Sequence, residues 1–326
     1  MRTFVRLLAV GLVLGVLALG LAQAPASDAA STTSKRAYLP SVHKDFTPTP
    51  TPTNTPTPSP TPDPSCQPTG QSYSLIPTDG RYQVSNPGSA APNVSPDLNL
   101  TVRGWVDTNA PLGLVNYNGG TDSAAPQLYS LFGDNRTPTF TSAHKVYDWD
   151  WTNNRRGNVL NTWPVTLLGM RTSAGEQIKS PSRGGSDIYQ GVYYALVVYA
   201  EKTRITLHYA RNDYVAPGYG IHLEGVCVDP NLLALYNQGN AGGRAQLPAL
   251  RANQPLGTAI GGELMAAIRD TGTFMDPRSQ KDWWQGRSAA YESIGGSVYP
   301  VSPDGTVSNE PVPVGATPVP TATPTP

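Results

Sequence analysis

The chain has 326 residues, and its 23 lysines and arginines balance its 23 aspartates and glutamates, so the formal net charge is zero. A neutral chain lacks the positive field that holds nucleic acid or an anionic membrane surface, which argues against both as partners.

The N-terminus has the pattern of a secretory signal peptide over residues 1–26. Arginines precede an apolar run from Leu7 to Ala22, and Ala24–Ala26 offers small residues for cleavage. An uncleaved anchor is the alternative, because the run approaches the roughly 17 residues that can span a bilayer. No later segment is long and apolar enough to cross a membrane. The sequence therefore predicts a secreted, extracellular or cell-envelope protein without a membrane span after cleavage.

Segments rich in proline and threonine flank the part of the chain that can fold. Residues 27–65 hold a pre-stalk segment and the linker "TPTPTPTNTPTPSPTPDP", and residues 288–326 end in "PVPVGATPVPTATPTP". Such segments cannot bury a core and favour extended polyproline II. Both are predicted to be disordered, and both are open to O-glycosylation.

The region between the two tails is predicted to be mostly β, as one domain or two small ones. Runs of aromatic and β-branched residues recur between turn residues, which is typical of a β-sandwich or barrel. The expected strands cover residues 99–106, 112–117, 127–132, 144–151, 163–170, 192–200, 204–210 and 219–228. One short helix is expected, with Asp229 as its N-cap, Pro230 in its first turn and Gly239 as its stop.

The only cysteines are Cys66 and Cys227. In an exported chain two cysteines most simply form a disulfide, and two unpaired thiols are the alternative. A bridge would join the start of the folded region to its middle and stabilise it by about 4 to 5 kcal/mol in the chain-entropy model.

The histidines and serines do not form a known catalytic motif. The H-x-H, H-E-x-x-H and C-x-x-C patterns of zinc sites are absent, and "GGSDI" and "IGGSV" lack the second glycine of a nucleophile elbow. His208 falls on the polar face of the strand 204–210, where we expect a solvated or hydrogen-bonded ring. The same role is expected for His144 and His222.

Aromatic and acidic residues are the remaining candidates for a site. In "YDWDWTNN" the alternation of a strand places Asp148 and Asp150 on one face and Trp149 and Trp151 on the other. Calcium binding by these oxygens is an alternative, although the loop glycine and terminal glutamate of a known calcium pattern are missing.

Tryptophan planes beside carboxylates can hold sugar rings, by stacking and by accepting hydroxyl protons. Burial of the tryptophans in the core is the alternative. A strand would point the neighbours Trp283 and Trp284 to opposite faces, so at least one of them is expected to be accessible. The predicted ligand-binding residues are Trp149, Trp151, Asp148, Asp150, Trp283 and Trp284.

From Val146 to Trp284 the order of motifs resembles the lysostaphin-type (LytM-like) zinc metallopeptidases. "GEQIKSPSRG", "ITLHYA", "NQPLG" and above all "RDTGTFMDP" stand where that family has "pVyApadG", "lYaHl", "GQxiG" and "RxNGxxVDP". The resemblance implies a barrel-sandwich-like core over residues 144–287, preceded by an N-terminal β region over residues 66–143. It also implies that Glu263–Arg269 is a strand of the terminal hairpin.

The zinc ligands of that family are missing. The H-x-H positions fall on Glu263 and Met265, and only His208 matches a family active-site histidine, which is not a ligand there. The resemblance therefore implies a degenerate peptidase with a vestigial groove around His208, Glu263 and Met265, and with no metal or other cofactor.

Together these features predict a secreted, non-catalytic protein that binds cell-wall peptidoglycan or another extracellular glycan. One alternative is an enzyme: a cell-wall hydrolase using residues such as His208, His222 and Glu263, or a calcium-assisted glycan enzyme around Asp148 and Asp150. The other alternative is a purely structural surface protein.

Overall fold

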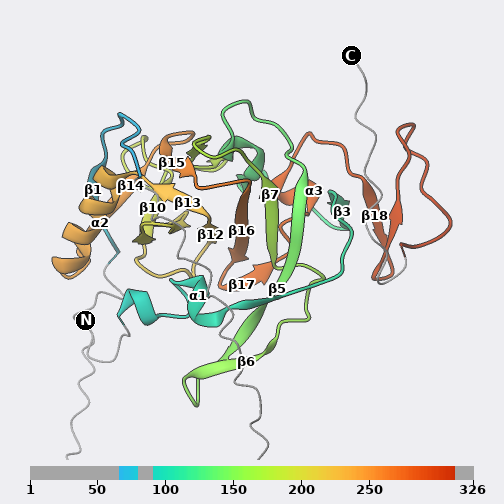
Figure 1. Cartoon of the computed structure of the whole chain (residues 1–326), viewed down its shortest axis with the longest axis horizontal. Coiled ribbons are helices and arrows are strands. Elements are labelled where there is room, and N and C mark those ends of the chain that lie inside the picture. Colours follow the sequence, from blue (N-terminus) through green and yellow to red (C-terminus); the bar gives the residue numbers. More distant parts are fainter. Residues whose placement is uncertain (1–65, 80–90, 313–326) are drawn as a thin grey trace, which may run out of the picture. The chain divides into compact units, whose positions relative to one another are not determined.

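The computed structural model describes residues 66–79 and 91–312. The predicted signal peptide (1–26), the linker (27–65) and the end of the C-terminal tail (313–326) lie outside the described residues. Within the described part the chain is mostly β with few short helices, as the sequence predicted (Figure 1). No helix among these residues combines the length and the apolar character needed to cross a bilayer.

An 11-stranded antiparallel sheet dominates the described part of the chain. Along it the strands follow the order β1-β14-β10-β11-β12-β16-β7-β5-β2, with β17 paired to β16 and β6 paired to β5. Their bounds are β1 Ser74–Pro77, β2 Trp105–Asp107, β5 Phe140–Asp150, β6 Arg155–Val159, β7 Leu167–Arg171, β10 Ala195–Glu201, β11 Arg204–His208, β12 Tyr219–Glu224, β14 Gln246–Leu250, β16 Glu263–Asp270 and β17 Thr273–Met275.

The smaller sheets are built from short strands. The sheet β13-β15-β8 has three strands, as does β19-β18-β3, and β4 pairs with β9 alone. Their bounds are β3 Val115–Asn116, β4 Pro126–Gln127, β8 Gln177–Lys179, β9 Ser182–Arg183, β13 Val226–Val228, β15 Pro255–Ala259, β18 Tyr291–Ile294 and β19 Ser297–Pro300. The helices are η1 Pro92–Val94, α1 Leu100–Arg103, η2 Leu128–Leu131, α2 Pro230–Ala241 and α3 Gln280–Trp283.

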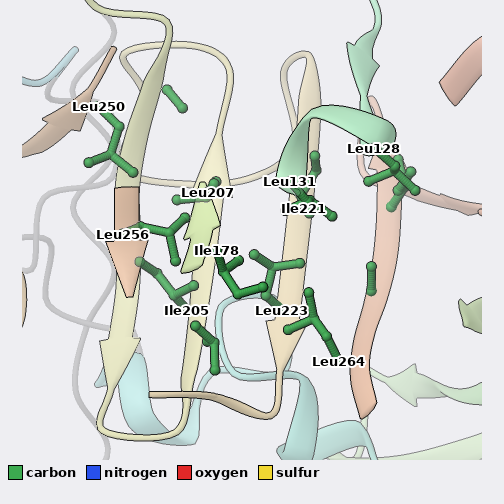
Figure 2. Packing of buried hydrophobic residues seen from close by; sticks show 14 of the residues in the cluster. Leu128, Leu131, Ile178, Ile205, Leu207, Ile221, Leu223, Leu250, Leu256 and Leu264 are labelled. Atoms are coloured by element: carbon green, nitrogen blue, oxygen red, sulfur yellow. The ribbon is translucent and has the colours of Figure 1, made fainter. Parts of the chain in front are cut away.

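The main hydrophobic core lies between the large sheet and the sheet β13-β15-β8. Ile205 on β11 and Leu223 on β12 are buried in one cluster with Leu256 on β15 and Ile178 on β8 (Figure 2). Burying each such aliphatic side chain stabilises the fold by about 1.5 to 3 kcal/mol. Two β layers enclosing one core is the sandwich-like arrangement expected from the strand pattern.

The boundary predicted between residues 143 and 144 does not separate two regions. It falls inside β5, while β1 and β2 pair with β14 and β5 of the same large sheet. Residues 66–143 therefore supply strands to the sheet that the following residues build.

Local backbone chemistry explains where the strand predictions fail. Residues 99–106 start with helix α1, because the Asn99 side chain accepts a hydrogen bond from the Thr101 N–H and caps the helix. Residues 127–132 contain the 3-10 helix η2. The run 219–228 breaks at Gly225, whose φ of 83° is open to glycine and lets the chain pass from β12 to β13.

The predicted helix is confirmed as α2. Asp229 caps it by accepting a hydrogen bond from the Asn231 N–H at 2.8 Å. The helix continues past Gly239 to Ala241, so that glycine is not the stop. A side chain at Gly239 would collide with the Gln246 carbonyl oxygen at 2.5 Å, so this glycine allows α2 to lie close to β14.

The disulfide between Cys66 and Cys227 is confirmed. The prediction of a disordered tail from residue 288 is wrong for residues 288–312, which contain the hairpin of β18 and β19. Gly295 and Gly296 both have positive φ, 59° and 86°, and form the two-residue turn that such a hairpin requires. Aromatic and β-branched residues in "YESIGGSVYP" supply the strands on either side of this Gly-Gly turn.

Candidate functional site

The hairpin of β16 and β17 forms one wall of a surface pocket. Its loop is Thr271-Gly272, with φ of 47° and 82°, as a tight two-residue turn between right-twisted strands demands. Arg269 fixes this turn from within, because its Nε and Nη2 donate to the Gly272 carbonyl oxygen at 2.9 and 2.6 Å. The Thr-Gly-Thr segment is therefore rigidly attached to the sheet.

The base of the pocket is a buried carboxylate between two buried arginines. The Asp97 Oδ1 accepts hydrogen bonds from Arg103 Nη2 at 2.9 Å and from Arg269 Nη1 at 2.8 Å. Burial alone would disfavour the charge, but Arg269 and Arg103 outweigh burial and hold the pKa of Asp97 below its usual range. Asp97 is thus ionised, and its negative charge is compensated by the two arginines inside the protein.

An aromatic layer lies against these arginines. Phe274 has the guanidinium carbons of Arg103 and Arg269 at 5.5 and 4.9 Å from its ring centre. The ring of His222 stacks on Phe274 with centres 6.0 Å apart. These contacts hold the guanidinium planes in place.

His222 is a neutral part of this buried layer. Its Nδ1 lies 3.0 Å from Thr206 Oγ1, and that hydroxyl donates its own proton to the Leu98 carbonyl oxygen. Nδ1 is therefore the protonated nitrogen, and Nε2 carries the lone pair. Burial, reinforced by Arg269, lowers the pKa of His222 to about 3.

The pocket above this base has a volume of about 380 Å³ and is closed on its other side by the end of β5. Trp151 and Asp148 stand on that rim, with 59 % of Trp151 and 61 % of the Asp148 side chain exposed. The Arg103 guanidinium carbon lies 6.0 Å from the Trp151 ring, and Arg103 Nη1 lies 3.5 Å from Asp148 Oδ1. The rim thus offers an indole face and a carboxylate to solvent.

The other predicted residues of "YDWDWTNN" do not line the pocket. Asp150 accepts hydrogen bonds from the backbone and side chain of Asn153 at 3.1 and 2.6 Å, and these bonds lower its pKa. It stabilises the turn between β5 and β6. Trp149 is half-buried on β5, and its indole nitrogen faces the interior.

The expectation that Trp283 or Trp284 would be accessible is wrong. Trp283 lies in α3 and Trp284 directly follows it, and both are buried. Their indole N–H groups donate to the carbonyl oxygens of Asp276 and Pro277 at 2.9 and 2.8 Å, so their polar atoms are satisfied inside the core. They belong to the scaffold and cannot stack on a ligand.

The residues of the predicted vestigial groove do not converge. His208 is buried at one end of the sheet, level with Arg269 through Gly220, while Glu263 pairs with Arg171 at the other end. Glu263 and Arg269 are separated along β16 by roughly 20 Å at a strand's rise per residue. The ring of His208 contacts the carbonyl oxygens of Asn212 and Pro217 and is not solvated.

The two other residues of the predicted vestigial groove have contacts of their own, away from His208. Met265 packs against the small apolar cluster between β5, β7 and β16. Glu263 accepts hydrogen bonds from the hydroxyls of Thr141 and Ser142 on β5. Within residues 66–79 and 91–312 no group of three or more His, Cys, Asp or Glu side chains is placed to hold a metal ion, including around Asp148 and Asp150.

Sequence reasoning found the exposed rim but missed the base of the pocket. Asp97 and Arg269 are 172 residues apart in the chain, so no local motif reports their contact. Arg103 is an ordinary residue of a short helix until the fold places it against Asp97. The one local signal was the Thr-Gly turn, which marks the position of Arg269.

Comparison with family models, with curated proteins and with solved structures finds no match for this chain. Any function is therefore inferred from the chain's own side chains.

Proposed function

We propose that this protein is an extracellular or cell-envelope protein that binds a glycan in the pocket of Trp151, Asp148 and Phe274, without cleaving it. The observation that carries the proposal is the exposure of Trp151 on the rim of a pocket whose base is fixed. A flat indole beside a carboxylate complements the C–H face and the hydroxyls of a sugar.

The charges of the pocket favour an uncharged ligand. Arg103 and Arg269 are balanced by Asp97 and Asp148, and the guanidinium groups already donate to Asp97 and to backbone oxygens. Among the described residues that line the pocket, no cation is left over to hold a phosphate or carboxylate. Neutral sugar rings, whose hydroxyls can donate to Asp148 and to the backbone oxygens of the Thr-Gly turn, fit this balance.

The carboxylates of the pocket do not form a glycosidase pair. Glycoside hydrolysis needs one carboxyl group with a raised pKa as acid and a second as nucleophile or base. Asp97 has a lowered pKa and is occupied by two arginines, so it cannot supply the acid. Binding without bond cleavage is the function that these groups support.

The disulfide between Cys66 and Cys227 supports an oxidising compartment. With the predicted signal peptide, this favours a location outside the cytoplasm. Peptidoglycan is a glycan found outside the cytoplasm and is therefore the first one to try.

The proposal is tested by retention of the full chain on purified peptidoglycan and by its mobility in gels containing soluble polysaccharides. Trp151→Ala should weaken binding at least about tenfold, which corresponds to ~1.4 kcal/mol and is typical of an aromatic anchor. Ile294→Ala is the matched control, because Ile294 is a similarly exposed apolar side chain, 49 % accessible, on β18 and outside the pocket.

Two results would contradict the proposal. One is that the unaltered chain is retained on none of these glycans, which would favour the purely structural role. The other is that Trp151→Ala binds as well as Ile294→Ala, which would place the glycan elsewhere.

A further inference from the structure

A chain of hydrogen bonds runs from Asp107 through His144 to Ser142. The Asp107 Oδ1 lies 2.9 Å from His144 Nδ1, and His144 Nε2 lies 2.8 Å from Ser142 Oγ. A nucleophile within hydrogen-bond reach of a base, with the base oriented by a third group, is the arrangement that activates serine hydroxyls. Asp107, His144 and Ser142 are distinct from the glycan pocket.

Strand register assembles this group without a motif. Asp107 on β2 is paired directly with His144 on β5, so the carboxylate faces the ring. Ser142 precedes His144 by two residues on the same strand, and a period of two puts both side chains on one face. This explains why a search for a nucleophile elbow does not find the serine.

Gly169 on β7 makes room for the serine. It is paired with Ser142, and a Cβ atom added to it would collide with Ser142 Oγ and with the Glu263 carboxylate. Glycine inside a strand weakens the strand, because it has no side chain to pack and more backbone freedom to lose. Its presence is explained by the space that these two side chains occupy.

The protons of the chain can be assigned from the partners. The Asp107 carboxylate can only accept, so His144 Nδ1 carries the proton and Nε2 offers its lone pair to the Ser142 hydroxyl. Ser142 has a second acceptor in Glu263 Oε2 at 2.9 Å, which also accepts from Thr141. The single Ser142 proton is therefore shared between a base and a competing carboxylate.

The contact between Asp107 and His144 contributes too little to the stability of the fold to explain its presence. The Asp107 side chain is 95 % exposed, whereas the His144 side chain is 11 % exposed. Even an ionic contact with so exposed a carboxylate would contribute only about 0 to 1 kcal/mol. What the contact does achieve is a fixed ring orientation, with Nε2 directed at Ser142.

We propose that Ser142 is the nucleophile of an acyl-transfer centre that hydrolyses oxygen esters, with His144 as general base and Asp107 as positioning residue. Ser142 Oγ forms a bond to the ester carbonyl carbon while its proton passes to His144 Nε2. The carbon–oxygen bond to the alcohol then breaks, and the alcohol leaves with that proton. Water next gives a proton to His144 and attacks the Ser142 ester. The carboxylic acid leaves, and Ser142 recovers its proton.

The surroundings select a small, neutral acyl group. Ser142 is half-buried between His144 and Glu263, so a bulky acyl chain cannot reach its hydroxyl. Asp107 and Glu263 flank the serine with negative charge and repel an anionic acyl group. An acetyl ester is the substrate class that meets both conditions. This inference stands independently of the glycan pocket.

The test uses the full chain, p-nitrophenyl acetate and a fluorophosphonate that labels activated serines. Mass spectrometry should find the fluorophosphonate on Ser142. Ser142→Ala should abolish labelling, and both Ser142→Ala and His144→Ala should lower kcat/KM for the acetate at least about 100-fold, as expected for loss of a nucleophile or a general base. Ser173→Ala, at an exposed serine in the turn after β7, is the matched control.

Glu263→Gln separates the two acceptors of the Ser142 proton. The glutamine amide can donate to Ser142 Oγ, which leaves the serine proton to His144, so labelling should become faster. Thermal unfolding of each variant shows that it is folded. The proposal is overturned if Ser142→Ala hydrolyses the acetate at the rate of Ser173→Ala. It is also overturned if Glu263→Gln loses labelling while His144→Ala keeps it, since Glu263 would then be the base.

Discussion

Replacing Asp97 by asparagine should destabilise the protein far more than its small change of shape suggests. The carboxylate is buried and accepts hydrogen bonds from Arg103 at 2.9 Å and Arg269 at 2.8 Å. Removing one partner of a buried ionic group costs about 3 to 5 kcal/mol, because the remaining charges stay buried without compensation. Asparagine keeps one acceptor oxygen, so we expect the low end, about 3 kcal/mol. The two guanidinium groups would then also repel each other across the base of the pocket.

The assay is urea unfolding of the full chain with its disulfide intact. With an m value of about 2 to 3 kcal/mol/M, a loss of about 3 kcal/mol moves the midpoint down by roughly 1 M. Asp79→Asn is the control, since Asp79 pairs with Arg211 at 2.7 Å but is half exposed, and an exposed pair is worth about 0 to 1 kcal/mol. Equal midpoints for the two variants would refute the reasoning, because they would mean that Asp97 is solvated and the base of the pocket is not rigid.

The remaining predictions concern pH, the disulfide and the space around the serine. The pKa of His222 is about 3 in the folded chain and 6.5 for an ordinary ring, so the folded state binds fewer protons between these values. The free energy of unfolding should therefore fall by up to about 1.4 kcal/mol per pH unit as the pH drops below 6.5, and His222→Leu should lose this part of the slope in urea titrations. Cys227→Ser should lower the free energy of unfolding by about 5 kcal/mol, because the bridge to Cys66 closes a loop with a sequence separation of 161. A loss below 1 kcal/mol in non-reducing urea would contradict that account. Gly169→Ala should displace Ser142, destabilise the fold by about 1 to 3 kcal/mol in thermal unfolding and abolish fluorophosphonate labelling, whereas unchanged labelling would show that the serine does not need this space.

The sequence correctly predicted strands in which the alternation of apolar and polar residues matches the face that is buried in the core. The strand 204–210 alternates Ile205 and Leu207 toward the core with Thr206 and His208 on the other face, as the period of two requires. What it could not predict is that the second face is buried as well. The segment ending at Leu98 covers Thr206 and accepts its hydroxyl proton at 2.6 Å, and this contact spans 108 residues.

The predictions of secondary structure failed where a capping or turn residue determines the local structure and the composition of the surrounding segment indicates another. Asn99 caps α1 inside a run that is rich in strand-forming residues, so "NLTVRGWV" begins as a helix. Gly295 and Gly296 form a hairpin in a segment whose later Pro and Thr content dominated the prediction of disorder. In both cases the capping or turn chemistry of one or two residues decides the local structure against the composition around them.

In the candidate site, too, residues with a local signal were predicted and residues placed by long-range packing were not. Trp151 and Asp148 were identified because a tryptophan and a carboxylate at a strand end are local features. Trp283 and Trp284 were misplaced because α3 turns both indoles inward onto backbone carbonyl oxygens, an arrangement that depends on the packing of a helix of four residues. Residues joined only by strand register, such as Asp107 and His144, have no signature that a single sequence reveals.

The pocket and the serine centre lie on one face of the large sheet. β5 carries His144 toward one end and Asp148 toward the other, and β16 likewise carries Glu263 and Arg269 at opposite ends. Between them the small apolar cluster of Val146, Leu167 and Ala267 fills the face, so the two regions are separated by roughly 13 to 20 Å along the strands. These three side chains are fully buried, so other parts of the chain cover this face between Trp151 and Ser142. The two regions are nevertheless fixed relative to each other, because β5 and β16 belong to the same hydrogen-bonded sheet and cannot shift independently.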